Sequence, residues 1–231
     1  MIKKKINKLK KLIKLNNLDG YIIPKNDQYF SEFAFPNRLK NISNFSGSAG
    51  FAIILKNKNY LFVDGRYTTQ AKIESSKNFQ IIEIPKLWPK NIFKSNNKIT
   101  IGFDPKLFTS STLLRYFGNV CKLYPINNNL IDEVYLEKTT KNVNLFYSLS
   151  SLTTGETTKS KINRVIEKIK KSKIDNIFIS APENVAWILN IRGGDGPNSP
   201  IPNSRLIISK TKKIFLISKI KKCKKLFREK I

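Results

Sequence analysis

The sequence predicts an α/β protein with two domains of the same type, each built from a mixed sheet flanked by helices. Three observations lead to this prediction. Short apolar runs typical of strands alternate with helix-period stretches along most of the 231 residues. The order helix, strand, helix, loop and hairpin occurs within residues 2–63 and again within residues 158–217. Much less chain follows the second hairpin than the first, so the second domain is expected to be incomplete.

The first element is a predicted helix over residues 2–16, in which apolar residues recur with a period near 3.6 and lysines lie between them. We interpret it as a surface helix whose apolar stripe packs on a sheet. A basic helix that binds a membrane surface or a calmodulin-like partner is the alternative, but the helix lacks the Trp or Phe anchors of such helices. The apolar positions are Ile2, Ile6, Leu9, Leu12 and Ile13.

The next elements are a short strand, an irregular segment and a hairpin. Residues 21–24 are expected to form a buried strand, and residues 27–35 a helical turn or an irregular segment. Two apolar runs, residues 51–55 and 60–63, are separated by the polar residues 56–59, which is the pattern of a β-hairpin with a four-residue loop.

A helix is predicted to follow the hairpin, because Asp64 can accept hydrogen bonds from the free N–H groups at its start. The rest of the first domain continues to alternate between strands and helices. The expected elements are a helix over 66–75, a strand over 79–84, a short helix through 93, a strand over 98–103, a helix over 109–117 and a strand over 121–124.

The pattern restarts after a polar, turn-rich stretch. We place the first domain at residues 1–132, a linker at 133–157 and the second domain at 158–231. The second domain is expected to contain helices over 158–171 and 181–190, a strand over 177–180, a hairpin of 205–209 with 213–217, and a basic helix from 219.

The net charge of +27 raises the possibility of a nucleic-acid or membrane-surface binder. The basic residues are 36 lysines and only 7 arginines, and Asn is also abundant at 25. Lys, Asn and Ile share A/T-rich codons, so genome composition accounts for the bias, and arginine, the preferred residue for bidentate phosphate contacts, is scarce. We therefore expect no nucleic-acid partner, while salt-sensitive DNA binding would support the alternative.

The sequence contains no histidine, which excludes Ser-His-Asp and Cys-His catalysis and metal sites that need imidazole. The two isolated cysteines form neither a metal-binding spacing nor a disulfide framework. Apolar runs stay far below the roughly 20 residues needed to span a bilayer, and the N-terminus has no segment of the signal-peptide type. A cytoplasmic location is the expectation that follows.

Three separated segments, in the right order, resemble the N-terminal part of Xaa-Pro aminopeptidases. The segments are FSGSAG at residues 45–50, VDGRY at residues 63–67 and AWILNIRG at residues 186–193. The chain is therefore similar to the two creatinase-like N-terminal domains of aminopeptidase P in the M24 metallopeptidase family, which have ribonuclease-H-like folds. Residues 27–33 also resemble a family segment, although Tyr29 stands where the family commonly has histidine.

The resemblance implies release of an N-terminal residue that precedes proline, by a pita-bread catalytic domain that holds two divalent metals, Mn or Zn. Those metals are bound through Asp, His and Glu, and no residue of this chain matches one of these ligands. The resemblance thus implies that residues 1–231 contain no catalytic residue and are inactive alone. The implied roles are control of substrate access and subunit contacts in a homodimer that acts on peptides. A free-standing module that docks on a separately encoded catalytic domain is the alternative.

Arg66, Arg192 and Asp195 are the candidate residues for substrate access or for an interface. Arg66 begins a helix, where a positive charge gains nothing from the helix dipole, so an ion pair with Asp64 or Glu32 is the structural interpretation. Arg192 and Asp195 lie in a long loop, in which they could pair with each other or contact the catalytic domain.

Two further features are interpreted as structural. Residues 47–50, Gly-Ser-Ala-Gly, precede a strand and lack a phosphate-binding pattern, so we expect a tight turn. Trp187 occurs at apolar helix spacing and is expected to lie in the core, not to act as a ligand platform.

Overall fold

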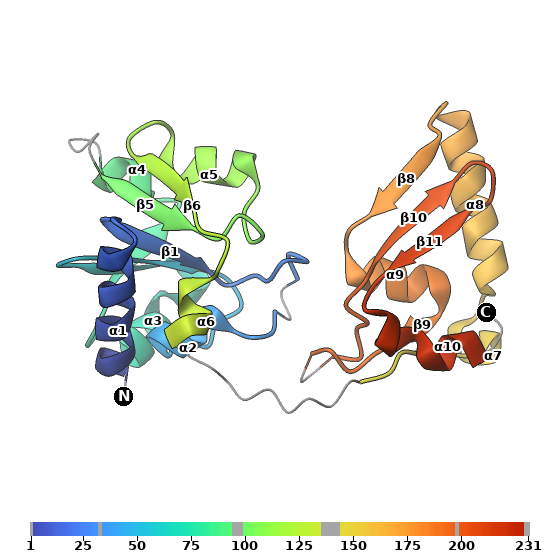
Figure 1. Ribbon diagram of the computed structural model, residues 1–231, viewed down its shortest axis with the longest axis horizontal. Coiled ribbons are helices and arrows are strands. Elements are labelled where there is room, and N and C mark those ends of the chain that lie inside the picture. Colours follow the sequence, from blue (N-terminus) through green and yellow to red (C-terminus); the bar gives the residue numbers. More distant parts are fainter. Residues whose placement is uncertain (1, 32–33, 94–98, 135–143, 197–198, 229–231) are drawn as a thin grey trace. The chain divides into compact units, whose positions relative to one another are not determined.

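The computed structural model describes residues 2–31, 34–93, 99–134, 144–196 and 199–228. The chain forms two compact units, unit 1 at Met1–Lys138 and unit 2 at Thr139–Ile231, and each is described by itself (Figure 1). In the described residues no helix combines the length and the apolarity that crossing a membrane requires.

Unit 1 is built on a mixed sheet with the strand order β4-β3-β2-β1-β5-β6. The three central strands β3, β2 and β1 are antiparallel to one another. On the outer sides of this group, β4 pairs with β3 and β5 pairs with β1, both in parallel. This arrangement confirms the predicted α/β class and the hairpin. The strands are β1 (Gly20–Pro24), β2 (Phe51–Leu55), β3 (Asn59–Asp64), β4 (Gln80–Ile84), β5 (Thr100–Phe103) and β6 (Lys122–Pro125).

Helices cover both faces of this sheet (Figure 1). Side chains of α1 and α2 pack on one face together with those of α6, and α4 and α5 cover the other. The interpretation of the first helix as a packed surface helix is confirmed, because its apolar stripe belongs to the first of these cores. The helices are α1 (Ile2–Leu15), α2 (Arg38–Ser43), α3 (Thr68–Ser75), α4 (Pro89–Ile92), α5 (Ser110–Phe117) and α6 (Leu130–Val134), with the 3-10 helix η1 (Gly65–Tyr67) before α3.

Two of these helices were not predicted. Helix α2 is capped by Asn37, whose side chain accepts from the N–H of Lys40, and it buries Leu39. Helix α6 straddles the predicted domain boundary at 132, and Leu130 in it is 1% exposed. Both helices are too short for a 3.6-residue period to be visible in the sequence, so only burial reveals them.

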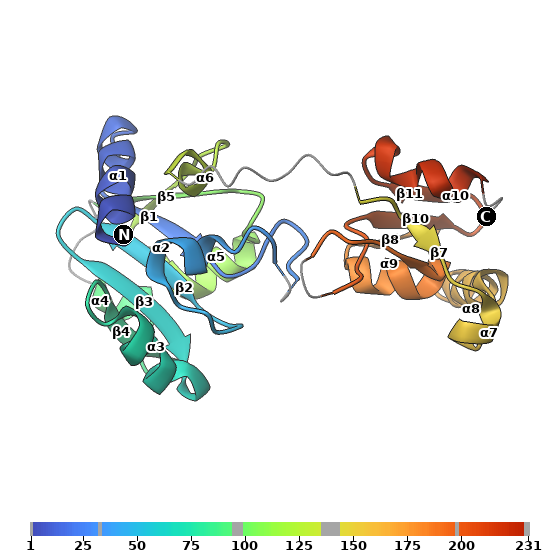
Figure 2. The same ribbon diagram turned by 90° about the horizontal axis from the view of Figure 1, so that it is seen from below.

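Unit 2 has a sheet with the strand order β11-β10-β8 and a two-stranded pair of β7 with β9. Helices α8 and α9 lie on the same face of the three-stranded sheet, where they form the core of the unit (Figure 2). The elements are β7 (Tyr147–Ser148), α7 (Ser151–Thr154), α8 (Thr158–Lys171), β8 (Asn176–Ile179), α9 (Pro182–Leu189), β9 (Ile191–Arg192), β10 (Arg205–Ser209), β11 (Ile214–Ile217), η2 (Ile220–Cys223) and α10 (Lys224–Arg228).

The sequence assigned residues 133–157 to a linker, of which 135–143 lie outside the described residues. From residue 144 on, the chain packs with unit 2. Phe146 is 0% exposed in the core of unit 2, and its N–H donates to the carbonyl of Lys222 at 2.8 Å. Its neighbours Leu145 and Tyr147 are also apolar but are exposed, so the sequence pattern alone does not show which of these residues is buried.

The central strands of the two units correspond in order and in register. In unit 1, Ile22 of β1, Ile53 of β2 and Tyr60 of β3 form one row across the sheet. In unit 2 the corresponding row is Phe178 of β8, Ile207 of β10 and Phe215 of β11. Helices α1 and α8 both pack on the opposite face, so the repeated element order seen in the sequence corresponds to a repeated substructure.

Candidate functional site

The turn after β3 positions the first candidate, Arg66. Asp64 caps η1 by accepting from the N–H of Arg66 at 3.0 Å, and it also accepts from the guanidinium Nη2 at 2.8 Å. Hydrogen bonding to Arg66 lowers the pKa of the Asp64 carboxyl. The expected Arg66–Asp64 ion pair is present, whereas Glu32, the other partner considered, lies outside the described residues. The Arg66 side chain is 73% exposed and presents its charge to solvent.

The glycines before β2 are required by close packing. A Cβ at Gly47 would lie 2.3 Å from the ring of Phe45, and a Cβ at Gly50 would lie 2.7 Å from the carbonyl oxygen of Phe62. Gly50 also has φ of +149°, which side chains rarely allow. Ser48 between them hydrogen-bonds the hydroxyl of Tyr67 at 2.7 Å. The stretch is thus a packed turn, as predicted.

Arg192 and Asp195 do not pair with each other in the described structure, which corrects the pairing expected within the loop. Arg192 Nη1 donates to the carbonyl oxygens of Ala186 and Ile191, at 3.3 and 2.9 Å. Asp195 forms an ion pair with Lys222, in which the carboxylate is 7% and the lysine 16% exposed. Lys222 lies 27 residues further along the chain, so sequence spacing gave no indication of it.

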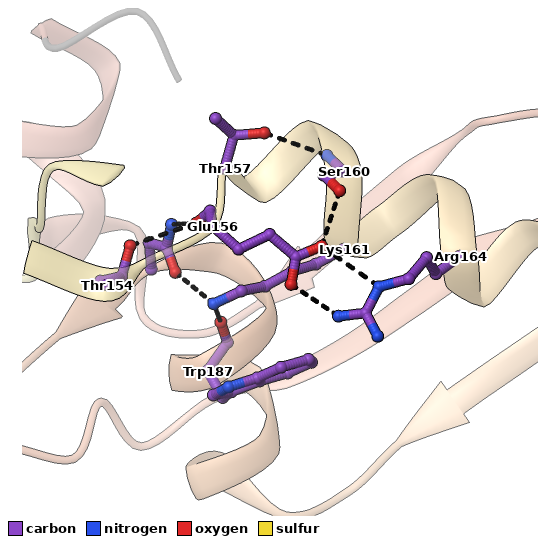
Figure 3. A network of polar contacts seen from close by, with 8 residues as sticks. Thr154, Glu156, Thr157, Ser160, Lys161, Arg164 and Trp187 are labelled. Carbon is purple, nitrogen blue, oxygen red and sulfur yellow. Dashed lines mark hydrogen bonds and ion pairs between the residues drawn. The ribbon is translucent and has the colours of Figure 1, made fainter. Parts of the chain in front are cut away.

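A second polar network joins the start of α8 to the end of α9 (Figure 3). Lys161 is 2% exposed, and its Nζ donates to Asn190 Oδ1 at 2.7 Å and to the carbonyl of Trp187 at 2.9 Å. The carbonyl belongs to the last turn of α9, so the ammonium satisfies an acceptor at the negative end of the helix. Asn190 in turn donates to the carbonyl of Glu156 at 2.8 Å.

The same network corrects the prediction for Trp187. Its side chain is 51% exposed and does not lie in the core. The ring instead packs against two cations, with Lys161 Nζ 4.3 Å and the Arg164 guanidinium carbon 5.7 Å from its centroid (Figure 3). Hydrogen bonds from Ser160 and Arg164 lower the pKa of Glu156, so this carboxylate stays ionised and holds Arg164 in place. Apolar spacing in the sequence did not distinguish this outward position on α9 from its buried neighbours.

Trp187 and Arg192, which are five residues apart in sequence, line one pocket of about 200 Å³. Glu183, Ala186 and the segment from Ser199 to Ile201 form the rest of its wall. An indole beside a guanidinium and a proline-containing wall can bind an apolar or planar group and orient it by hydrogen bonds. Arg66 and Asp195 are outside the lining of this pocket.

The described residues do not fit a metal ion. They contain no group of three or more His, Cys, Asp or Glu side chains close enough to hold one. Burial raises the pKa of the Cys121 thiol to about 11 and also raises that of Cys223, so neither is a ready nucleophile at neutral pH.

Comparison with known proteins identifies two domains. Residues 5–134 match a family model described as creatinase/prolidase N-terminal domain, and residues 137–231 match a second model with the same description. These matches correspond to unit 1 and unit 2.

Curated relatives and a solved structure agree with the family models. Probable Xaa-Pro aminopeptidase P of Coprinopsis cinerea is 31% identical over 210 residues, which cover 86% of this chain and 34% of that protein. Xaa-Pro aminopeptidase 1 of Dictyostelium discoideum is 28% identical over an alignment of 239 positions, gaps included, that covers 95% of this chain and 38% of that protein. The chain therefore spans about a third of the length of these relatives.

The solved structure is that of an X-prolyl aminopeptidase from Caenorhabditis elegans, described as a cytosolic enzyme with a di-nuclear active site. It matches 99% of this chain with 41% of its own, at 26% identity and a TM-score of 0.86. From the two family models and these relatives, the chain belongs to the creatinase/prolidase N-terminal domain family and is homologous to the N-terminal part of Xaa-Pro aminopeptidases.

Proposed function

We propose that this chain acts as the non-catalytic N-terminal part of a Xaa-Pro aminopeptidase. The observation that supports the proposal best is the structural match over 99% of the chain with 41% of the nematode enzyme. In this proposal a domain outside residues 1–231 holds the two metals and cleaves the bond before proline. The two units limit access to that domain and contribute to a homodimer interface, in the cytoplasm.

The contacts of the candidate residues are compatible with such a role. Arg66 presents a charge from a rigid turn, since η1 is capped by Asp64 and packed through Tyr67. Arg192 lines a pocket together with the half-exposed Trp187. We infer that Arg192 contacts peptide or catalytic domain from this pocket, and that the ion pair of Asp195 with Lys222 positions the loop that follows Arg192.

The proposal is tested with two proteins. One is the purified chain, incubated with Mn²⁺ or Zn²⁺ and a fluorogenic Xaa-Pro peptide. The other is a chimera in which this chain replaces the matching 41% of the nematode enzyme. We expect turnover from the chimera and none from the chain alone. Arg192→Ala in the chimera should raise KM more than it lowers kcat, because a binding contact made equally in substrate and transition state acts on KM.

Two outcomes would contradict the proposal. Robust turnover by the chain alone would show that it carries its own catalytic residues. A chimera that folds and binds metal but does not cleave the peptide would show that the two units cannot serve as this part of the enzyme. Light scattering of the chimera, run in parallel, checks the dimer, and a monomer with full activity would remove the interface role.

A further inference from the structure

The solvent-facing side of helix α1 in unit 1 is covered by lysines. The apolar stripe of α1 is buried in the core and fixes the helix on the sheet, so packing holds its basic side outward. Lys5 lies at the flank, where its Nζ donates to the carbonyl of Asn41 at 3.0 Å. The other six lysines are exposed or half-buried, and we call them the α1 lysine face: Lys3, Lys4, Lys8, Lys10, Lys11 and Lys14.

No acidic side chain in the part of the chain that the structure describes pairs with the α1 lysine face. Helix α1 itself contains neither Asp nor Glu. Helix α6, which packs beside α1, carries Asp132 and Glu133, but Asp132 forms its ion pair with Arg38. The positive charges of the face are therefore available to an anionic surface.

Helix stability does not explain where these lysines lie. Lys3 and Lys4 occupy the first turn, where the helix dipole disfavours a positive charge. Lys4, Lys8 and Lys11 follow one another at spacings of four and three residues, so neighbouring ammonium groups repel each other. In α8, the counterpart of α1 in unit 2, three lysines lie in the last turn, where the dipole favours them. The charges of α1 thus lower the stability of the helix, and a bound polyanion would relieve their repulsion.

The lysine-rich composition of the chain does not account for the α1 lysine face either. Lysine makes up 36 of the 231 residues, but seven of the 14 residues of α1. Arginine is absent from this helix. A lysine ammonium is a point charge and lacks the planar fork with which arginine binds single phosphates or bases. An array of lysines alone therefore fits a continuous layer of negative charge better than individual groups that must be recognised.

An exposed leucine lies in line with the lysines. Leu15 is 77% exposed and follows Lys11 by four residues, so it continues the row of Lys4, Lys8 and Lys11. An apolar side chain in this place gains free energy when it enters the boundary between lipid headgroups and acyl chains, an environment that a phosphate backbone does not offer. The combination favours the surface of an anionic bilayer over a nucleic acid.

We propose that the α1 lysine face binds the surface of a bilayer that contains anionic phospholipids. The ammonium groups lie in the layer of negative headgroups, and Leu15 enters the headgroup boundary. Helix α1 stays packed on unit 1, because its apolar stripe belongs to the core, so the contact is peripheral and reversible. This interaction surface goes beyond the proposed function and does not depend on peptidase activity.

The test uses the full chain and vesicles of phosphatidylcholine, with or without phosphatidylserine. Co-sedimentation measures binding. We expect binding only to the vesicles that contain phosphatidylserine, and weaker binding as salt is raised, because ions screen exposed charges. The double variant Lys4→Gln and Lys11→Gln should weaken binding about 25-fold, because each lysine close to an anionic surface contributes roughly fivefold. Leu15→Gln should weaken binding about tenfold through the lost apolar contact.

The double variant Lys90→Gln and Lys106→Gln is the matched control. Both lysines are exposed, and they belong to α4 and to the segment before α5, which cover the opposite face of the sheet. This variant loses the same charge as the α1 variant, but its binding should equal that of the unchanged chain. Glutamine forms helices about as well as lysine, and circular dichroism before the titration verifies that all variants keep the fold.

Three results would overturn the proposal. The first is no binding to phosphatidylserine vesicles even at low salt. The second is equal weakening by the two double variants, which would assign the attraction to the net charge of the whole chain. The third is tighter binding to a DNA duplex of mixed sequence that depends on Lys4 and Lys11 but not on Leu15, which would assign the face to nucleic acid. Because none of these readouts uses turnover, they are independent of the enzymatic test of the proposed function.

Discussion

The two units share the same central strands but differ in how completely their sheets are covered. The row Ile22, Ile53 and Tyr60 in unit 1 is at most 6% exposed, because α4 and α5 pack over it. In the corresponding row of unit 2, Phe178 is 56% and Phe215 is 53% exposed. In the described residues, unit 2 has one buried core where unit 1 has two.

This difference shows that two units with the same order of helices and strands can differ in how strongly burial stabilises them. In unit 1 the central strands have apolar cores on both faces, so each core side chain stabilises the fold by its full burial. In the described residues of unit 2, the face beneath α8 and α9 is buried whereas Phe178 and Phe215 on the other face are exposed, so the unit relies more on polar contacts such as those of Lys161 and Asp195. The predictions below test this contrast, from the largest expected effect to the smallest.

The sharpest test compares Ile53→Ala with Ile207→Ala, the middle residues of the two rows. Ile53 is 0% exposed in the core that α4 and α5 cover, so its truncation should cost about 3–4 kcal/mol of unfolding free energy. Ile207 is only half-buried, so the same change should cost about 1 kcal/mol. Urea unfolding measures both. Trp88 lies in unit 1 and Trp187 in unit 2. If one of them is replaced by Phe, the fluorescence of the remaining tryptophan reports the unfolding of its own unit. Equal losses of unfolding free energy in the two variants would mean that the Ile207 side chain is as buried as that of Ile53.

The next test compares ion pairs. Asp195→Ala should destabilise unit 2 by about 3 kcal/mol, because it leaves the mostly buried ammonium of Lys222 without a carboxylate. Arg66→Ala in unit 1 should cause no measurable change, because that guanidinium is exposed to solvent. Thermal and urea unfolding of both variants provide the measurement. A stable Asp195→Ala protein would show that Lys222 reaches solvent when its partner is removed.

The Lys161 network gives the third test. Lys161→Met should cost unit 2 about 2 kcal/mol, because the carbonyl of Trp187 and the amide oxygen of Asn190 lose a charged donor. Lys159→Met, two residues earlier on the exposed side of α8, is the control and should leave the unfolding midpoint unchanged. Trp187 fluorescence should also shift only in Lys161→Met. A loss of stability in both variants would point to helix propensity or net charge as the cause.

The smallest effect concerns pH. Hydrogen bonds from Lys56 and from the N–H of Thr100 lower the folded-state pKa of Asp19 in unit 1. A carboxyl whose pKa is lower in the folded state than in the unfolded state stabilises the fold at pH values above the unfolded-state pKa. This stabilisation is lost as the pH falls through the folded-state pKa. Asp19→Asn should therefore cost less than about 1 kcal/mol at neutral pH and nothing near pH 2.

Urea unfolding at a series of pH values checks this. Asp175→Asn, which removes an exposed carboxylate paired with Lys210 in unit 2, is the control at neutral pH and should leave the free energy of unfolding unchanged there. A cost of Asp19→Asn that grows on acidification would reverse the sign and contradict the assignment.

Much of the fold was predictable where periodicity extends over several residues. The long helices α1 and α8, the hairpins β2–β3 and β10–β11 and the cap by Asp64 were all predicted from local pattern. Helices α2 and α6 escaped detection because they are too short to show a period. Phe146 was hidden for a related reason, since its neighbours Leu145 and Tyr147 are apolar as well but exposed, and no period distinguishes the buried residue.

The candidate site was predicted less completely. The sequence singled out Arg66, Arg192 and Asp195, and it correctly suggested Asp64 as a partner of Arg66 because the two are adjacent on a turn. The partner of Asp195 and the exposure of Trp187 were mispredicted. Lys161, the best-buried cation of the network in Figure 3, was not singled out, because in a chain with 36 lysines its residue type carries no information.

The sequence by itself determined the α/β class, the repeated order of elements and the family resemblance, because each depends on residues near one another in the chain. Tertiary structure alone decided which apolar rows are buried and which carboxylate Lys222 meets. These properties depend on residues tens of positions apart that meet only after the chain has folded. Local pattern specifies the elements, whereas burial and pairing are properties of their packing.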